Sequence, residues 1–107
     1  MDVREMIATT LELEGTEVVT AANGLEAYHL ARLHHPKLIV LDLMMPVMTG
    51  EEFRKVQLAH EAIRDIPVVV LSAHHDAQQI AARMHVAACL RKPIDIDELQ
   101  ALVKRYW

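Results

Sequence analysis

The sequence predicts an α/β domain in which helices cover both faces of a parallel sheet. Short aliphatic segments of the kind that form buried parallel strands recur along the chain, at 38–42, 68–72 and 88–90. Amphipathic helical patterns separate them and are long enough for right-handed crossover connections. With 107 residues and no repeat or low-complexity stretch, the chain is expected to be one domain, residues 1–107.

The first third of the chain predicts a helix, a strand and a second helix. The helix over 2–14 ends at Gly15, and its inner face is a stripe at helical spacing made of Val3, Met6, Ile7, Thr10 and Leu11. The β-branched segment 17–21 is predicted as a strand. Asn23 with Glu26 is typical of a helix N-terminus, so a helix should run to about residue 34, with its inner face at Ala27, Leu30 and Ala31.

The strands at 38–42 and 68–72 are unbroken aliphatic runs, so both are expected to be buried on both faces. Capping patterns place the remaining helices. Thr49 and Glu52 begin one that runs to about residue 58, with Phe53 and Val56 inward. A cap at Asp76 begins the helix 77–85, with Ile80, Ala81 and Met84 inward, and Asp95 begins the last helix, with Ile96, Leu99, Leu102 and Val103 inward.

Composition excludes several classes of function. The formal net charge is −4, there is no cluster of Lys and Arg, and aromatic residues make up only 4% of the chain, so direct nucleic-acid binding is not expected. No apolar run reaches the roughly 20 residues of a membrane span, and no leader pattern opens the chain. The single Cys89 excludes an intramolecular disulfide, which fits a reducing, cytoplasmic location.

Three polar residues stand at the ends of successive predicted strands: Asp42, Ser72 and Lys92. Because the carboxyl ends of parallel strands share one edge of a sheet, where α/β proteins bind ligands, these side chains should meet. Each residue also has a plainer explanation. Asp42 and Ser72 could be turn formers, and Lys92 could be a solvated lysine.

The segments around these residues carry a family resemblance. LIVLDLMMPVMTG at 38–50, VVVLSA at 68–73 and LRKPID at 90–95 occur in the order and spacing of the receiver domain of two-component response regulators, which the chain resembles over essentially its whole length. The resemblance implies a flavodoxin-like, three-layer, doubly wound parallel sheet with strand order 2-1-3-4-5.

The resemblance also implies roles for individual residues. Asp42 would be the carboxylate phosphorylated by a histidine kinase or phosphotransfer protein, and a downstream effector would read the change. Asp42 and the backbone carbonyl of Met44 would be ligands of Mg²⁺. Ser72 and Lys92 would contact phosphoryl oxygens, and a cis peptide before Pro93 would aim Lys92 inward.

Two departures from the family pattern matter. The chain starts after the family's first strand and after the acidic pair that holds magnesium, so four strands are expected and Mg²⁺ should be weakly held. Cys89 replaces the aromatic residue whose rotation reports phosphorylation. Because the missing strand is interior, we expect either a rearranged sheet in which 17–21 leaves its usual place, or a homodimer or strand-exchanged oligomer.

Two other functions compete with phosphate acceptance. A receiver-like interaction domain that is not phosphorylated would also explain the missing acidic pair. A phosphohydrolase with an aspartyl nucleophile would need a second acid two residues after the first, where Met44 stands.

The remaining side chains that could suggest a site have simpler explanations. The pairs His34-His35 and His74-His75 lack the spacing of a helical zinc site and are expected to be solvated. Met44, Met45 and Met48 are expected to pack, and Cys89 to be a buried small hydrophobe. The terminal Tyr106 and Trp107 could anchor a partner or simply be frayed.

Overall fold

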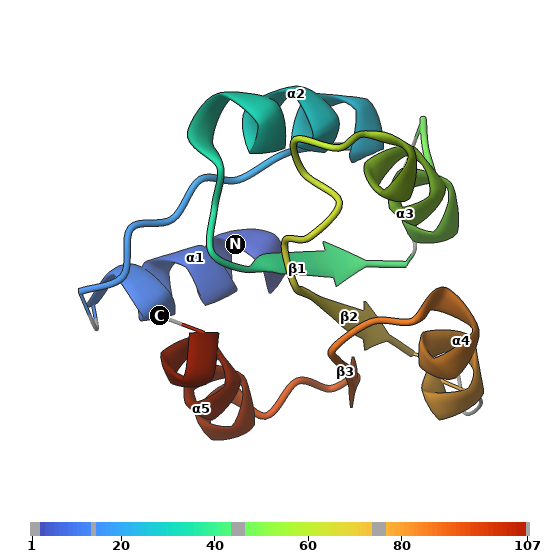
Figure 1. Ribbon diagram of the computed structural model, residues 1–107. Helices are drawn as coiled ribbons and strands as arrows, with labels where there is room; N and C mark the ends of the chain where they lie inside the picture. Colours follow the sequence, from blue (N-terminus) through green and yellow to red (C-terminus); the bar gives the residue numbers. More distant parts are fainter. Residues whose placement is uncertain (1–2, 14, 44–46, 74–76, 107) are drawn as a thin grey trace.

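The computed structural model describes residues 3–13, 15–43, 47–73 and 77–106. Helices and strands alternate along them after two initial helices (Figure 1). The elements are α1 (Val3–Leu13), α2 (Gly24–His34), β1 (Ile39–Asp42), α3 (Gly50–Ala59), β2 (Val68–Ser72), α4 (Ala77–Met84), β3 (Ala88–Arg91) and α5 (Ile96–Tyr106). Every predicted helix is present, and the ends of the observed helices lie within about one to three residues of the predicted ends.

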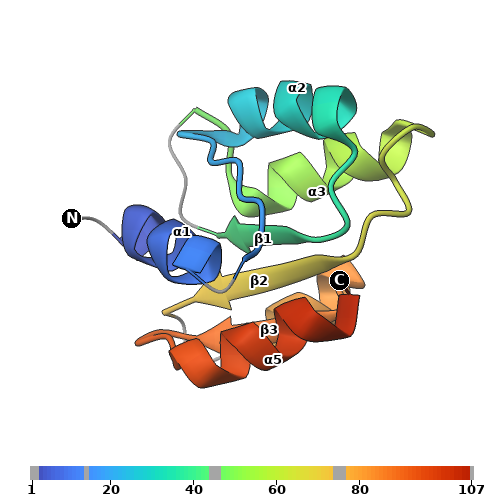
Figure 2. The same cartoon turned by 90° about the vertical axis from the view of Figure 1, so that its left-hand side faces the viewer.

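The strands form a three-stranded parallel sheet in the order β1-β2-β3. Val40 pairs with Val69, and Val70 pairs with Cys89. Because the chain returns through a helix between each pair, all three strands end at the same edge of the sheet (Figure 2). The α/β class and the parallel topology predicted from the sequence are confirmed.

Two apolar layers cover the sheet, one on each face. Successive side chains of β2 point to opposite faces, so each layer receives alternate residues of this strand. Val69 and Leu71 pack with residues of α1 and α5, whereas Val68 and Val70 pack with Phe53 of α3 and residues of α4. All five residues of β2 are buried, so its predicted double burial is confirmed. The result is the expected arrangement of three layers, helix on sheet on helix.

The prediction of a strand at 17–21 is wrong. Among the described residues the segment pairs with no strand, and the sheet has three strands rather than four. The β-branched sequence gives the segment an extended backbone, but a strand also needs a neighbour to accept and donate its ladder bonds. Hydrogen bonds hold the backbone at the two ends of this stretch, where the Thr16 N–H donates to the Leu11 carbonyl (3.1 Å) and the Arg4 guanidinium donates to the Ala21 carbonyl (2.8 Å).

The burial predicted for two other elements is only partly correct. In β1, Leu41 is buried, but the other three residues are half-buried because the strand is at the edge of the sheet. In α1, Ile7 and Leu11 are buried as expected, whereas Met6 is 41% exposed. The inner face of α1 is therefore narrower than its apolar stripe.

The predicted helix caps hold where the structure describes them. Asn23 accepts a hydrogen bond from the Glu26 N–H (2.9 Å), and Thr49 with Glu52 forms a complete capping box. Asp95 accepts from the N–H groups of Asp97 and Glu98. The predicted cap at Asp76 lies outside the described residues.

Candidate functional site

The candidate site lies at the sheet edge where the strands end. Asp42 is the last residue of β1, Ser72 is the last residue of β2, and Lys92 follows β3 directly. The Lys92 Nζ donates to Asp42 Oδ2 at 2.7 Å, so the structure brings these two predicted residues together. About a third of each side chain is exposed, 36% for Asp42 and 28% for Lys92, which leaves the pair open to a partner.

Ser72 is tied to the same edge through its backbone. Its carbonyl accepts a hydrogen bond from the Lys92 N–H at 2.8 Å, and its side chain is buried, with 1% of the residue exposed. The peptide between Lys92 and Pro93 is cis, as predicted. The three residues therefore share one edge of the sheet, where Ser72 is buried and the ion pair is partly exposed.

Gly50 has a role that the sequence analysis missed. Its N–H donates to the Leu43 carbonyl (3.2 Å), and a Cβ at this position would lie 2.9 Å from Leu43 Cα and 3.1 Å from the Asp42 carbonyl oxygen. The glycine thus lets the start of α3 press against the strand end that carries Asp42. In the sequence this residue appears only as part of a capping pattern, which carries no sign of the close approach.

The described residues do not fit a resident magnesium ion. Mg²⁺ prefers about six oxygen ligands, whereas the carboxylate offered here is that of Asp42, whose Oδ2 already binds an ammonium group. Within the described ranges, no group of three acidic, histidine or cysteine side chains could hold a metal ion. The Met44 carbonyl, the other predicted ligand, lies outside the described residues.

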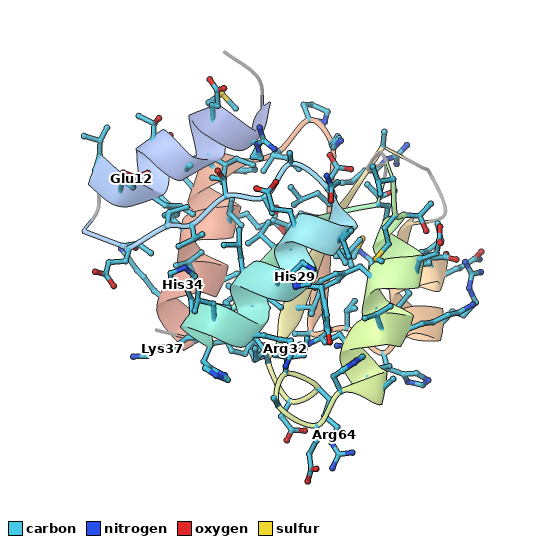
Figure 3. All side chains as sticks on the ribbon, turned by 90° about the horizontal axis from the view of Figure 1, so that it is seen from above. Glu12, His29, Arg32, His34, Lys37 and Arg64 are labelled. Atoms are coloured by element: carbon cyan, nitrogen blue, oxygen red, sulfur yellow. The ribbon has the colours of Figure 1, made fainter. Side chains whose placement is uncertain are left out.

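His34, His35 and Cys89 agree with their simpler explanations. His34 and His35 are exposed at the end of α2, where Figure 3 labels His34 beside the turn to Lys37. His74 and His75 lie outside the described residues. Cys89 is half-buried against the α3 and α4 layer, and burial raises the pKa of its thiol.

A buried polar network on α3 was also missed. Arg54 and Gln57 are 9% and 0% exposed, and the Arg54 Nη1 donates to Gln57 Oε1 at 2.8 Å. Arg54 also donates to the carbonyls of Met84 and His85, and Gln57 donates to those of Ile63 and Ile66. Desolvation lowers the pKa of Arg54. The network joins α3 to the end of α4 and to the loop before β2.

Comparison with known proteins decides the family. The sequence model of the response regulator receiver domain matches residues 1–104. The chain belongs to the response regulator receiver domain family. Receiver domains are signalling modules of two-component systems, and the segments that carry the resemblance include all three strand-end residues of the site.

Individual relatives agree with this assignment. The chain is 36% identical to a probable transcriptional regulator, ycf27, of Cyanophora paradoxa over 97% of the chain and 43% of that protein. It is 34% identical to the polar-differentiation response regulator DivK of Brucella ovis, over 90% of the chain and 80% of DivK. The chain spans less than half the length of the curated transcriptional regulators that it matches, ycf27 among them.

Solved receiver structures have the same fold. The chemotaxis protein CheY4 of Vibrio cholerae superimposes with a TM-score of 0.86 at 31% identity, covering 98% of this chain and 89% of CheY4. The receiver domain of the histidine kinase PA1611 from Pseudomonas aeruginosa, solved with magnesium in its active-site cleft, gives a TM-score of 0.80 at 25% identity, covering 95% and 83% of the two chains. None of the helices described in this receiver combines the length and apolar character needed to cross a bilayer.

Proposed function

We propose that this receiver accepts a phosphoryl group on Asp42 from a histidine kinase or phosphotransfer protein in the cytoplasm, and that the modified domain then binds a downstream effector. The observation that carries the proposal is the 2.7 Å contact between the Lys92 ammonium and the Asp42 carboxylate at an open sheet edge. A carboxylate that pairs with an ammonium group at the strand ends is placed to attack a phosphoryl group approaching from solvent.

The transfer itself needs little covalent chemistry from the domain. One Asp42 oxygen forms a bond to phosphorus while the bond from phosphorus to the donor histidine nitrogen breaks, and the freed imidazole takes up a proton from solvent. The Lys92 ammonium offsets part of the negative charge on the equatorial oxygens. Ser72, at the end of the neighbouring strand β2, would donate its hydroxyl to a phosphoryl oxygen.

Because the described residues do not fit magnesium, the 107-residue chain should react slowly. An anionic carboxylate and an anionic phosphoryl group repel each other, and at about 4 Å two unit charges interact by roughly 4 kcal/mol at an effective dielectric of 20. Lys92 reduces this repulsion but is a single flexible charge. A version extended upstream by a strand ending in two acids should react faster and bind Mg²⁺.

The test is intact mass after incubation with acetyl phosphate, with and without Mg²⁺. We expect a slow gain of one phosphoryl group on the parent chain, none on Asp42→Asn, and less on Lys92→Met than on the control Lys104→Met, which alters an exposed lysine of α5. Equal gains on the parent and Asp42→Asn would refute Asp42 as the acceptor.

Two further results of this experiment are informative. No gain on the parent or on the extended version would favour the alternative, a receiver-like interaction domain that is not phosphorylated. A complete, magnesium-dependent gain on the parent would show that the acidic pair is dispensable and that our argument about charge is wrong.

A further inference from the structure

The outer side of α2 carries apolar residues that no described element covers. In Figures 1 and 2 this helix forms the outermost layer of the molecule, above β1 and beside α3. Its buried residues are Gly24 and Ala31, whereas Leu25 is 47% exposed and Leu33 is 73% exposed. Because successive helical residues are about 100° apart, the two leucines lie within about 80° of each other around the helix. A surface helix usually carries polar residues on its outer side, so this side of α2 is suited to contact with another protein.

The exposed residues of α2 are arranged symmetrically about His29. Leu25 and Leu33 each lie four residues from His29, and Glu26 and Arg32 each lie three residues from it. In an antiparallel pair of such helices with His29 at the twofold axis, each Leu25 is level with the partner's Leu33. Each Glu26 is level with the partner's Arg32, so opposite charges lie at the same height on the two flanks of the pair. A parallel pair would bring like charges level instead.

Tyr28 holds Arg32 at the edge of this surface. The Arg32 Cζ lies 5.5 Å from the centre of the Tyr28 ring, and the Arg32 Nη1 donates to the Tyr28 hydroxyl at 3.3 Å. The ring of His60, which ends α3, packs against the same tyrosine with 4.8 Å between ring centres. Among the described residues Arg32 forms no ion pair with a carboxylate. Its charge is therefore available to a carboxylate of another molecule.

The charge of the chain favours contact through this side of α2. The formal net charge is −4, so two copies repel each other as a whole. No acidic residue occurs between positions 27 and 41. Figure 3 looks onto this side of the molecule and labels, on α2 and the turn after it, His29, Arg32, His34 and Lys37. Contact between two α2 helices thus joins the copies where their mutual repulsion is small.

We propose that the protein forms a transient dimer through α2, in which the helices of two copies pack antiparallel about a twofold axis at His29. We call the contact surface the α2 face, and it consists of Leu25, Glu26, His29, Arg32 and Leu33. A helix of 11 residues is about 16 Å long, so the interface belongs to the small class, below about 1,200 Å², and association is weak. The contact uses no residue of the candidate site and does not require phosphorylation of Asp42.

Cysteine cross-linking tests this arrangement, in chains whose own Cys89 is replaced by Ser. Packed helices lie about 8 to 10 Å apart, so side chains at the twofold axis come within reach of a disulfide. With oxidised glutathione, His29→Cys should therefore link to itself roughly tenfold faster than the control Arg105→Cys, which has its thiol at an exposed position of α5. Like positions away from the axis are about 12 Å apart along it. A mixture of Leu25→Cys and Leu33→Cys should therefore link the two variants to each other roughly fivefold faster than either links to itself.

Charge reversal tests the same contact without a covalent bond, by sedimentation at high protein concentration. Arg32→Glu places carboxylates level with each other and should lower the fraction of dimer, whereas the control Arg105→Glu changes the net charge equally and should lower it less. Glu26→Arg should also lower the fraction of dimer. A mixture of Arg32→Glu and Glu26→Arg should contain more dimer than either variant alone, because opposite charges are level again.

Three results would overturn the proposal. Equal rates of linking for His29→Cys and Arg105→Cys would show that α2 makes no contact between copies. Faster linking of Leu25→Cys to itself than to Leu33→Cys would mean that the helices are parallel. Equal dimer fractions for Arg32→Glu and Arg105→Glu would place the contact on another surface. Each measurement uses the unphosphorylated chain, so failure here leaves the proposed phosphorylation of Asp42 untouched.

Discussion

Replacing Arg54 by methionine tests whether the buried polar network of α3 stabilises the receiver. The guanidinium group makes three hydrogen bonds, to the carbonyls of Met84 and His85 and to Gln57 Oε1, at 2.7 to 3.1 Å. Methionine keeps much of the packing volume and removes all three donors. The variant also removes the buried charge, so its cost comes from the acceptors that lose their partner.

The magnitude follows from where those acceptors lie. Gln57 is fully buried, so water cannot replace the donor to its Oε1, and a buried acceptor without a partner costs about 1 to 3 kcal/mol. The bond to the Met84 carbonyl is buried and the bond to the His85 carbonyl is partly buried, and each lost bond costs about 0.5 to 1.5 kcal/mol. We expect Arg54→Met to lower the free energy of unfolding by about 2 to 6 kcal/mol, a large part of the roughly 5 to 15 kcal/mol of a small domain.

The assay is urea unfolding monitored by circular dichroism. The unfolding midpoints of the variants are compared on the condition that the m value, the slope of the unfolding free energy against urea concentration, is unchanged. The matched control is Arg83→Met, which breaks an exposed ion pair with Glu51 and should cost no more than about 1 kcal/mol. In the double variant Arg54→Met/Gln57→Leu the orphaned amide oxygen is gone, so the double variant should cost less than the sum of the single variants. A loss for Arg54→Met no larger than that of the control, or strict additivity, would refute the reasoning.

Three other predictions address single positions. Val47 is β-branched with φ of 69° and is 78% exposed, so Val47→Asn should relieve left-handed strain and raise the melting temperature, equivalent to about 1 kcal/mol; an unchanged or lower value would contradict this. Gly50→Ala should destabilise the domain by about 1 to 3 kcal/mol and shift the backbone NMR resonances of Leu43, because its Cβ would press on backbone atoms. Burial raises the pKa of Cys89, so the folded state holds the thiol proton more tightly than the unfolded state. The stability that this provides is full below the unfolded thiol pKa of about 8.5 and declines above it. Urea unfolding should therefore show a steeper fall between pH 8 and 10 for the parent than for Cys89→Ser.

The sequence was sufficient to predict that Asp42 and Lys92 lie close together, because each position follows from a residue at the end of its own strand. A buried aliphatic run predicts a parallel strand, and the ends of parallel strands share an edge, so Asp42 and Lys92 could be placed together without any long-range information. The contact at 2.7 Å confirms that placement. The helix N-caps at Asn23, Thr49 and Asp95 were predictable for the same reason, since both partners lie within four residues of each other.

The polar network could not be predicted because it depends on distant backbone. Arg54 and Gln57 look like solvated residues of an amphipathic helix, next to Phe53, which was correctly assigned to the core. Their partners are carbonyls up to 31 residues away, and these become acceptors only when α4 and the loop before β2 are in place. Nothing in the local pattern distinguishes such an arginine from an exposed one.

The two errors at the sheet edge have one cause. Strand propensity is a preference for an extended backbone, which 17–21 has, but a ladder requires a neighbouring strand at about 4.8 Å. A cavity of about 930 Å³ lies between β1 and 17–21 where that neighbour would be, so 17–21 stays outside the sheet. The cavity leaves β1 with only Leu41 buried, whereas β2, with a strand on each side, is buried throughout. The aliphatic composition of a segment therefore shows that the segment can be buried, whereas its neighbours in the fold determine how much of it is buried.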